Sequence, residues 1–274
     1  MKSEGEQSRS SKVSYKILLN KAVRNPKVII PYFSEYIRVR NNKFHLPSMN
    51  QEFKPRVLPP YEFAQRLTGM RPDFRTESLN KIYNDLKDTV KNSYLGITDE
   101  ENLSIISFED ALSIYLVIKS QRPTIVLETG VSDGMSTSII LKALSENGKG
   151  TLHSIDLPEV GMPQLINKLP GWVIPENLKD DWNLYLGKSK KLLPEITSKL
   201  DKVDVFLHDS EHSYGNMLFE FETVSKVMPN GSVLLSDDAL ANNSIIYFSS
   251  TNGMKPEDIL FTKEGLAGIR INRS

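Results

Sequence analysis

The sequence predicts a doubly wound α/β fold: a mainly parallel sheet of seven strands with helices on both faces, preceded by a helical N-terminal extension. Three observations predict it. Short apolar runs recur through residues 105–274, they alternate with helix-like segments, and several of them end in an acidic residue. Continuous apolar strands are typical of parallel sheets covered on both faces. We therefore expect a disordered tail at 1–12, a helical extension or cap at 13–104, and the α/β domain at 105–274.

The N-terminal third shows helical patterns but no motif to which chemistry can be assigned. Residues 1–12 are polar and have no apolar periodicity, which is typical of disorder. Amphipathic segments follow between 13 and 39, and several prolines predict an extended connector over 41–62. Helices are expected again at about 61–68 and 77–93. This region is expected to cover the substrate opening or to form a contact between subunits.

The elements of the α/β domain are predicted in order from their apolar runs. Ser107 is expected to cap a helix over 107–120, because acids follow it in the first turn. Two adjoining β-like runs near the C-terminus predict an antiparallel hairpin that completes the sheet, at 259–262 and 266–272. The other runs predict parallel strands at 125–128, up to Asp156, at 183–187, at 203–207 and at 231–235.

Composition excludes several classes of protein. The chain has 274 residues, 39% of them hydrophobic, and no cysteine, so neither a disulfide framework nor thiol or zinc-thiolate chemistry is available to it. The first dozen residues lack the apolar core of a signal peptide. No apolar run approaches the roughly 20 residues of a membrane span. We expect a cytoplasmic protein with no membrane span.

Charge is distributed unevenly along the chain. The net charge is zero, yet residues 1–45 hold ten Lys and Arg against three Glu, a local charge of +7. Such a basic arm is typical of a solvated helix face, or of a segment that packs on an acidic body of its own or a partner subunit, so a homo-oligomer contact is expected there. Basic and aromatic residues are not interleaved, and we expect no nucleic-acid partner.

The stretch from Thr124 to Asp156 predicts a strand, turn, helix and strand that form a nucleoside pocket. Gly130 and Gly134 allow a tight turn and a close approach of ligand to backbone. Ser136 lies near the start of the next helix, whose free N–H groups suit a polar or anionic group. Asp156 ends the second strand, where its carboxylate is suited to accept both hydroxyls of a ribose.

The glycine spacing indicates which nucleoside is bound. A dinucleotide fingerprint reads G-x-G-x-x-G, whereas Gly130 and Gly134 are separated as G-x-x-x-G. Glu128 precedes them, and its carboxylate would repel a pyrophosphate but suit an ammonium group. The run E-T-G-V-S-D-G-M-S resembles motif I of the class I S-adenosylmethionine (SAM)-dependent methyltransferases, which have a Rossmann-like fold of seven strands. This resemblance implies SAM as cofactor, bound by Glu128, Gly130, Gly134, Ser136 and Asp156.

Further cofactor contacts follow from the same resemblance. In these methyltransferases the turn after the third strand lies beside the adenine, which implies that Gly187 and Ser189 line the cofactor site. His208 is expected to line the cofactor side or to pack beneath it.

A second constellation follows the fourth and fifth predicted strands. Asp209, Asp237 and Asp238 are expected to meet at one edge of the sheet, because ligands of such sheets bind at the carboxyl ends of strands. Clustered carboxylates are unfavourable unless a cation or proton compensates them, and Mg²⁺, Ca²⁺ and Mn²⁺ prefer carboxylate oxygens. The segments H-D-S-E-H-S-Y and L-L-S-D-D resemble metal-dependent O-methyltransferases of the macrocin O-methyltransferase type, within methyltransferase family 24. That resemblance implies Asp209, Asp237 and Asp238 as ligands of Mg²⁺, and His212 beside Asp209 as the catalytic base.

The resulting prediction is a SAM-dependent O-methyltransferase, dependent on a divalent metal, that methylates a hydroxyl of a small molecule or sugar. Other hypotheses stay open: a nucleotide-cofactor oxidoreductase, a non-catalytic SAM-binding module, or a methyltransferase whose acids hold SAM and substrate amines without metal. No N-P-P-Y-type motif of base methylation is present. His212 could instead have a structural role, and Asp238 could cap the following helix.

Overall fold

The structure is a computed structural model, and it describes residues 53–72, 75–94, 105–157 and 168–273. The disorder predicted for 1–12, the helices predicted between 13 and 39, and the basic arm with its subunit contact lie outside the described residues. The helices predicted at about 61–68 and 77–93 are present as α3 and α4.

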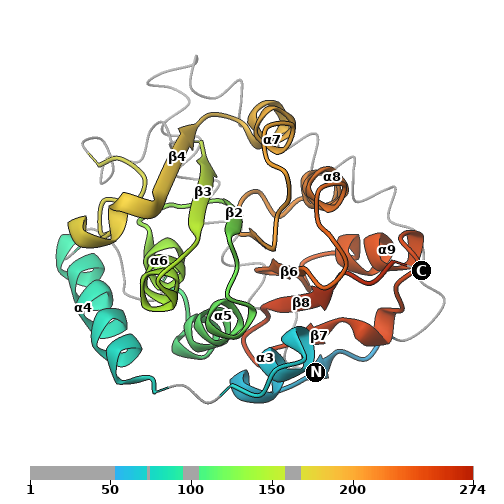
Figure 1. Cartoon of the computed structure of the whole chain (residues 1–274), viewed down its shortest axis with the longest axis horizontal. Coiled ribbons are helices and arrows are strands. Elements are labelled where there is room, and N and C mark those ends of the chain that lie inside the picture. The colour runs from blue at the N-terminus through green and yellow to red at the C-terminus, as the bar shows by residue number, and fades with distance from the viewer. Residues whose placement is uncertain (1–52, 73–74, 95–104, 158–167, 274) are drawn as a thin grey trace, which may run out of the picture. The chain divides into compact units, whose positions relative to one another are not determined.

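The described residues contain one eight-stranded sheet, with the strand order β1-β7-β8-β6-β5-β2-β3-β4 (Figure 1). All neighbouring strands run parallel except β8, which is antiparallel to both β6 and β7. The predicted doubly wound, mainly parallel sheet with its C-terminal hairpin is therefore confirmed. The bounds are β1 Arg56–Val57, β2 Ile125–Thr129, β3 Thr151–Asp156, β4 Trp182–Leu186, β5 Val205–His208, β6 Val233–Ser236, β7 Leu260–Phe261 and β8 Ala267–Arg270.

The sequence predicted seven strands, whereas the described residues contain eight. Strand β1 lies in the segment predicted as an extended connector, and it pairs in parallel with β7 at the edge of the sheet. It has only two residues and stands between Pro55 and Pro59, so it offers no alternating pattern that could distinguish a strand from a connector.

Helices cover both faces of the sheet (Figure 1). Helices α3, α4, α5 and α6 build one hydrophobic core with one face, and α7, α8 and α9 build a second core with the other. Ser107 caps α5 as predicted, because its Oγ accepts from the backbone N–H of Asp110 at 3.0 Å. The bounds are α3 Pro60–Thr68, α4 Glu77–Tyr94, α5 Phe108–Gln121, α6 Met135–Asn147, α7 Ser189–Thr197, α8 Tyr214–Ser225 and α9 Ser244–Thr251, with 3₁₀ turns at Glu176–Asp181 and Pro256–Asp258.

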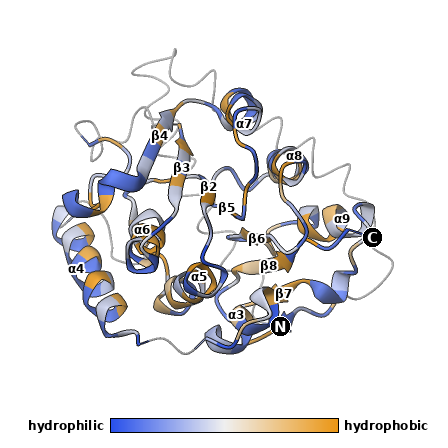
Figure 2. Cartoon of the chain, in the orientation of Figure 1, coloured by the Kyte–Doolittle hydropathy of each residue, from blue (hydrophilic) through white to orange (hydrophobic). Residues whose placement is uncertain are grey.

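Successive strand residues point into the two cores alternately. In β2, Val126 belongs to the core under α5 and α6, whereas Leu127 belongs to the core under α8. Figure 2 shows the apolar residues concentrated on the strands and on the helix faces that meet them. The same alternation sends the last two residues of β2, Glu128 and Thr129, to opposite faces of the sheet.

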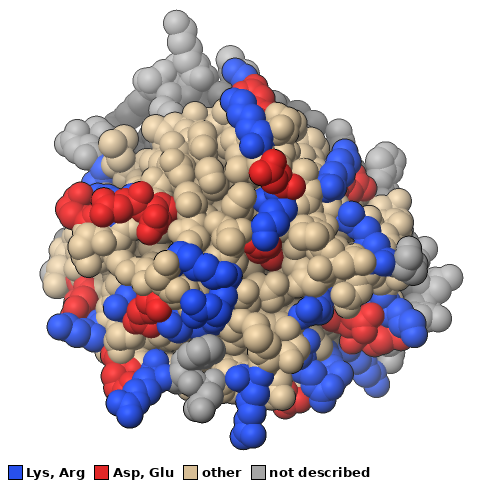
Figure 3. Space-filling view, in the orientation of Figure 1, with Lys and Arg blue, Asp and Glu red and all other residues tan. Residues whose placement is uncertain are grey.

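The described residues form one compact unit, so β1, α3 and α4 belong with the sheet that follows them. The division into a tail, an extension and a domain from residue 105 stays a prediction. Among the described residues, no helix is long and apolar enough to cross a membrane. On the face shown in Figure 3, basic and acidic side chains are interspersed.

Candidate active site

Two acidic residues lie side by side, each directly after the end of one of two neighbouring strands. Asp209 follows β5 and Asp237 follows β6. The N–H of Asp209 donates to the carbonyl of Thr129 at 2.8 Å, and the N–H of Asp237 donates to the carbonyl of His208, also at 2.8 Å. These bonds extend the sheet by one residue beyond the strands. The predicted convergence of the two acids is therefore what the structure shows.

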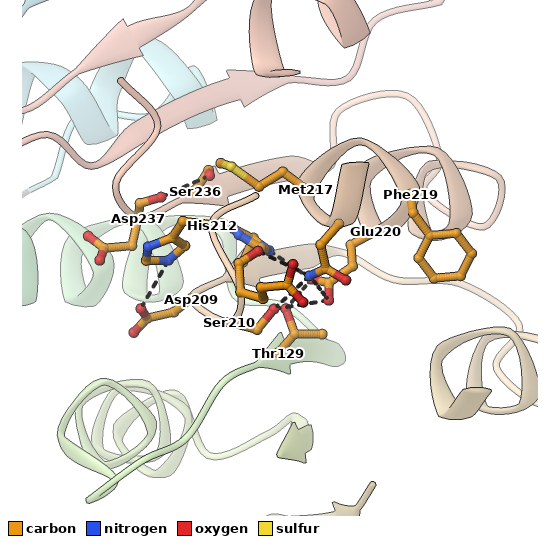
Figure 4. A network of polar contacts seen from close by, with 12 residues as sticks. Thr129, Asp209, Ser210, His212, Met217, Phe219, Glu220, Ser236 and Asp237 are labelled. Carbon is orange, nitrogen blue, oxygen red and sulfur yellow. Dashed lines mark hydrogen bonds and ion pairs between the residues drawn. The ribbon is translucent and has the colours of Figure 1, made fainter. Parts of the chain in front are cut away.

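The two acids form a cluster with His212. Each residue offers one oxygen or nitrogen, and these three atoms lie within 4.8 Å of one another (Figure 4). Burial raises the pKa of Asp209 well above its ordinary range, and the charge of Asp237 raises it further. Burial and the charge of Asp238 also raise the pKa of Asp237. Such a pair requires a cation or a shared proton. The chemistry of this donor set therefore suits a divalent cation.

His212 is oriented by Asp238. Its Nδ1 lies 3.0 Å from Oδ2 of Asp238, whereas its Nε2 is buried, lies 3.9 Å from Oδ1 of Asp209 and has no hydrogen-bond partner among the residues that the structure describes. Burial and the neighbouring His208 lower the pKa of His212, which favours the neutral imidazole. Because an ionised carboxylate only accepts hydrogen bonds, the proton belongs on Nδ1. The free lone pair of Nε2 then faces the acid pair.

Asp238 is the member of the predicted metal set that the structure separates from the others. Its side chain is 66% exposed, its backbone is in the left-handed region at φ 46°, and its carboxylate contacts His212. The three-residue cluster contains His212 in its place. Coordination of a metal by Asp238 stays a prediction. Asp238 does not cap the following helix, because the N-cap residue of α9 is Asn243.

The carboxylate of Glu128 is enclosed by hydroxyl groups. It is fully buried, and it accepts hydrogen bonds from Ser136 Oγ at 3.0 Å, Thr137 Oγ1 at 2.8 Å and Ser154 Oγ at 2.8 Å. Burial raises the pKa of Glu128 to about 7, although the three hydroxyls oppose the shift. These bonds connect β2 to α6 and β3. Contact of Glu128 or Ser136 with the cofactor stays a prediction.

Asp156 holds the loop that follows β2. Its Oδ2 accepts from the N–H of Val131 at 2.6 Å and from the N–H of Ser132 at 2.8 Å. Burial raises the pKa of Asp156, although these two backbone donors oppose the shift. The residue thus connects the end of β3 to the glycine loop, and its bond to a ribose stays a prediction.

Glycine is required at the two motif positions, because another segment of the chain lies against each of them. A Cβ on Gly130, whose φ is 88°, would lie 1.8 Å from the carbonyl oxygen of Asp209. A Cβ on Gly134, whose φ is 101°, would lie 2.7 Å from the Cα of Gly171. Residues near Gly171 therefore cover the N-terminus of α6, the place where a dinucleotide fold binds pyrophosphate. Contact of either glycine with a cofactor stays a prediction.

Gly187, Ser189 and His208 were also predicted to lie at the cofactor site. Gly187 donates its N–H to the carbonyl of Asp156 at 2.8 Å, which places it at the carboxyl end of β3 and β4. Ser189 begins α7 and hydrogen-bonds Glu220, and His208 is fully buried with Nδ1 2.7 Å from Oε2 of Glu220. The latter two thus join a buried network beneath the site, and their contact with a cofactor stays a prediction.

The centre of that network, Glu220, was not anticipated from the sequence. It also accepts from Thr129 and Ser210, which carried no predicted role (Figure 4). A signal was present: Met217, Glu220 and Val224 occupy the buried stripe of α8, so an acid stands where helical periodicity calls for an apolar residue.

The strand order and the acids at the strand ends define the class I SAM-dependent methyltransferase fold. Residues 127–239 match the family model described as a methyltransferase domain, which is methyltransferase family 24. Residues 127–239 therefore form a methyltransferase domain of the class I SAM-dependent type. No match was found among curated protein sequences.

Solved structures support the assignment of the fold. A methyltransferase from Podospora anserina, bound to S-adenosylhomocysteine (SAH), is 13% identical, with a TM-score of 0.50 over 73% of this chain and 97% of that one. An O-methyltransferase from Bacillus cereus in complex with SAH is 16% identical, with a TM-score of 0.51 over 77% and 97%. The O-methyltransferase TomG from Streptomyces achromogenes, in complex with SAM, is 13% identical, with a TM-score of 0.51 over 69% and 90%.

Proposed function

We propose that this protein is a SAM-dependent O-methyltransferase that requires a divalent cation, Mg²⁺ in the first instance, and methylates a hydroxyl of a small molecule or sugar. The observation that carries the proposal is the cluster of Asp209, His212 and Asp237 at the carboxyl edge of the sheet. The O-methyltransferases among the structures of the same fold support oxygen as the acceptor atom.

In the proposed site, Asp209 and Asp237 hold the cation. Burial and the charge of Asp237 raise the pKa of Asp209, so a bound cation would relieve the repulsion between the two carboxylates. A cation held there lowers the pKa of a nearby hydroxyl and helps to place its oxygen. Asp238, whose carboxylate contacts His212, is assigned to orienting that histidine, although the family resemblance implies that it is a metal ligand.

His212 is the proposed base. Its buried Nε2 has no partner among the described residues, and its neutral form can accept the proton of the acceptor hydroxyl. In the balanced step, the O–H bond breaks and its proton moves to Nε2, the oxygen bonds to the methyl carbon of SAM, and the C–S bond breaks to leave neutral SAH. The carboxylate of Asp238 then stabilises the imidazolium that forms.

Titration calorimetry with Mn²⁺ and Mg²⁺ in the presence of SAH tests this proposal. We expect the wild-type chain to bind one cation, and D209N and D237N each to weaken binding by at least about tenfold. D201N removes an exposed carboxylate from the turn before β5 and is the matched control. SAH formation with a panel of phenols and sugars, with and without EDTA, then tests turnover. SAM binding without turnover on any acceptor would favour a non-catalytic module, and turnover in EDTA would exclude the metal requirement.

A further inference from the structure

A fully buried carboxylate, that of Glu220, lies beneath the cluster on the α8 face of the sheet. It is the shared acceptor of donors from β2, β5, the loop after β5 and α8 (Figure 4), and of one donor from α7. These donors are Thr129 Oγ1 at 2.6 Å, His208 Nδ1 at 2.7 Å, Ser210 Oγ at 3.0 Å, Asn216 Nδ2 at 3.0 Å, and Ser189. One side chain therefore connects the ends of two central strands to two helices.

The charge of Glu220 suits this role. Burial by itself would raise the pKa of this carboxyl, but the hydrogen bond and charge of His208, together with the hydroxyl donors, bring it below its ordinary value. An ionised carboxylate has about four acceptor sites and no donor, which matches the four bonds from Thr129, His208, Ser210 and Asn216, two at each oxygen. No neutral side chain of the same size offers as many acceptor sites.

The network reaches the loop that carries the proposed cluster from both ends. At the start of the loop, His208 precedes Asp209, and its ring packs edge-on against that of His212 with 5.4 Å between centroids. Further along, the amide of Asn216 also donates to the carbonyl of Glu211 at 3.2 Å. The residues on both sides of Asp209, and the residue before His212, are therefore held by groups that converge on one carboxylate.

We propose that Glu220 is a positioning residue, which holds the 209–213 loop in the geometry that places Asp209 for cation binding and His212 beside it as the base. The inference rests on the proposed function. Glu220 touches none of the reacting groups, and it acts through His208, Ser210 and Asn216. Ligand geometry of this kind tolerates displacements of only about 0.5 Å, so a loosened loop should weaken the site while the fold persists.

The matched comparison is E220Q against E146Q. Glu146 also collects several donors, from Ser78, Tyr115, Lys119 and Lys142, but it connects helices α4, α5 and α6 rather than the site. Mn²⁺ binding is measured by electron paramagnetic resonance with saturating SAH, below the melting temperature of each variant. We expect E220Q to weaken Mn²⁺ binding at least about tenfold and E146Q to leave it within about twofold. E220D, which keeps the charge, should recover part of the loss.

Unchanged Mn²⁺ binding in E220Q, or an equal loss in E146Q, would overturn the inference. If the wild-type chain binds no Mn²⁺, the metal proposal fails separately. The imidazole ¹⁵N signals of His212 then decide whether Glu220 positions that residue. Signals that shift in E220Q but not in E146Q support positioning of His212, and signals that stay in place in both variants exclude it.

Discussion

The carboxylate of Asp238 meets Nδ1 of His212 at 3.0 Å, and this pairing determines which imidazole nitrogen is available for chemistry. The geometry depends on the left-handed backbone of Asp238, and on Asn242, whose side chain donates to the carbonyl of His212 at 2.9 Å. The loop after β6 thus holds both the ring and the backbone of His212.

We predict that D238N will disturb the tautomer of His212 without removing the cation site. An amide can donate as well as accept, so it no longer requires the proton on Nδ1. The chain has only four histidines, which makes ¹⁵N spectra of their rings tractable. We expect a single tautomer protonated at Nδ1 in the wild-type chain and a mixture in D238N.

The same variant separates the two roles discussed for Asp238. If it orients His212, Mn²⁺ binding by D238N should stay within about threefold of wild type, while D237N loses tenfold or more. Equal losses in the two variants would instead make Asp238 a metal ligand, as the family resemblance implies.

The sequence predicted the parts of the fold and site that depend on local pattern. Short apolar runs located β2, β3, β5 and β6. The rule that ligands bind at strand ends predicted that Asp209 and Asp237 lie close together, and the structure places them so. The pairing of Asp238 with His212 was not predictable in this way, because it depends on a loop conformation that leaves no periodic signal.

Glycine roles show a second limit of sequence reasoning. The sequence indicates that Gly130 and Gly134 need space, but it does not indicate which atoms occupy that space. The structure fills it with the backbone of Asp209 and Gly171, whereas a ligand was expected. Glu220 shows a third limit: the acid was visible in the apolar stripe of α8, but its donors come from segments far away in sequence.

Gly130 should be far less tolerant of substitution than Gly148. We predict that G130A will destabilise the fold by at least about 3 kcal/mol, because a left-handed alanine is strained and its Cβ would collide with Asp209. Gly148 has a similar φ of 66°, but its Cβ would meet no atom of the described residues within 4 Å, so G148A should lose only about 1 to 2 kcal/mol. Urea unfolding measures both. Equal losses would mean that the contact with Asp209 is not tight.

The pH dependence of stability should reveal the buried Glu128. Its pKa is raised from 4.5 to about 7, so between these values the folded chain binds a proton that the unfolded chain does not. The stability associated with this group is therefore full below pH 4.5, falls as pH rises through that window, and is lost above about pH 7. E128Q removes the titration. We expect the unfolding free energy of E128Q, relative to wild type, to rise by roughly 2 to 3 kcal/mol from pH 5 to pH 8.

E146Q is the control for that measurement, because the pKa of Glu146 is shifted in the opposite direction from that of Glu128. Partial burial opposes ionisation of Glu146, but hydrogen bonds from Tyr115 and Ser78 and the neighbouring Lys142 hold its pKa at about 2. A lowered carboxyl pKa contributes stability that is complete above pH 4.5 and is lost as pH falls towards 2, so the difference between E146Q and wild type should be flat from pH 5 to pH 8. A flat difference for E128Q as well would show that Glu128 stays ionised throughout, with its three hydroxyl donors outweighing the effect of burial.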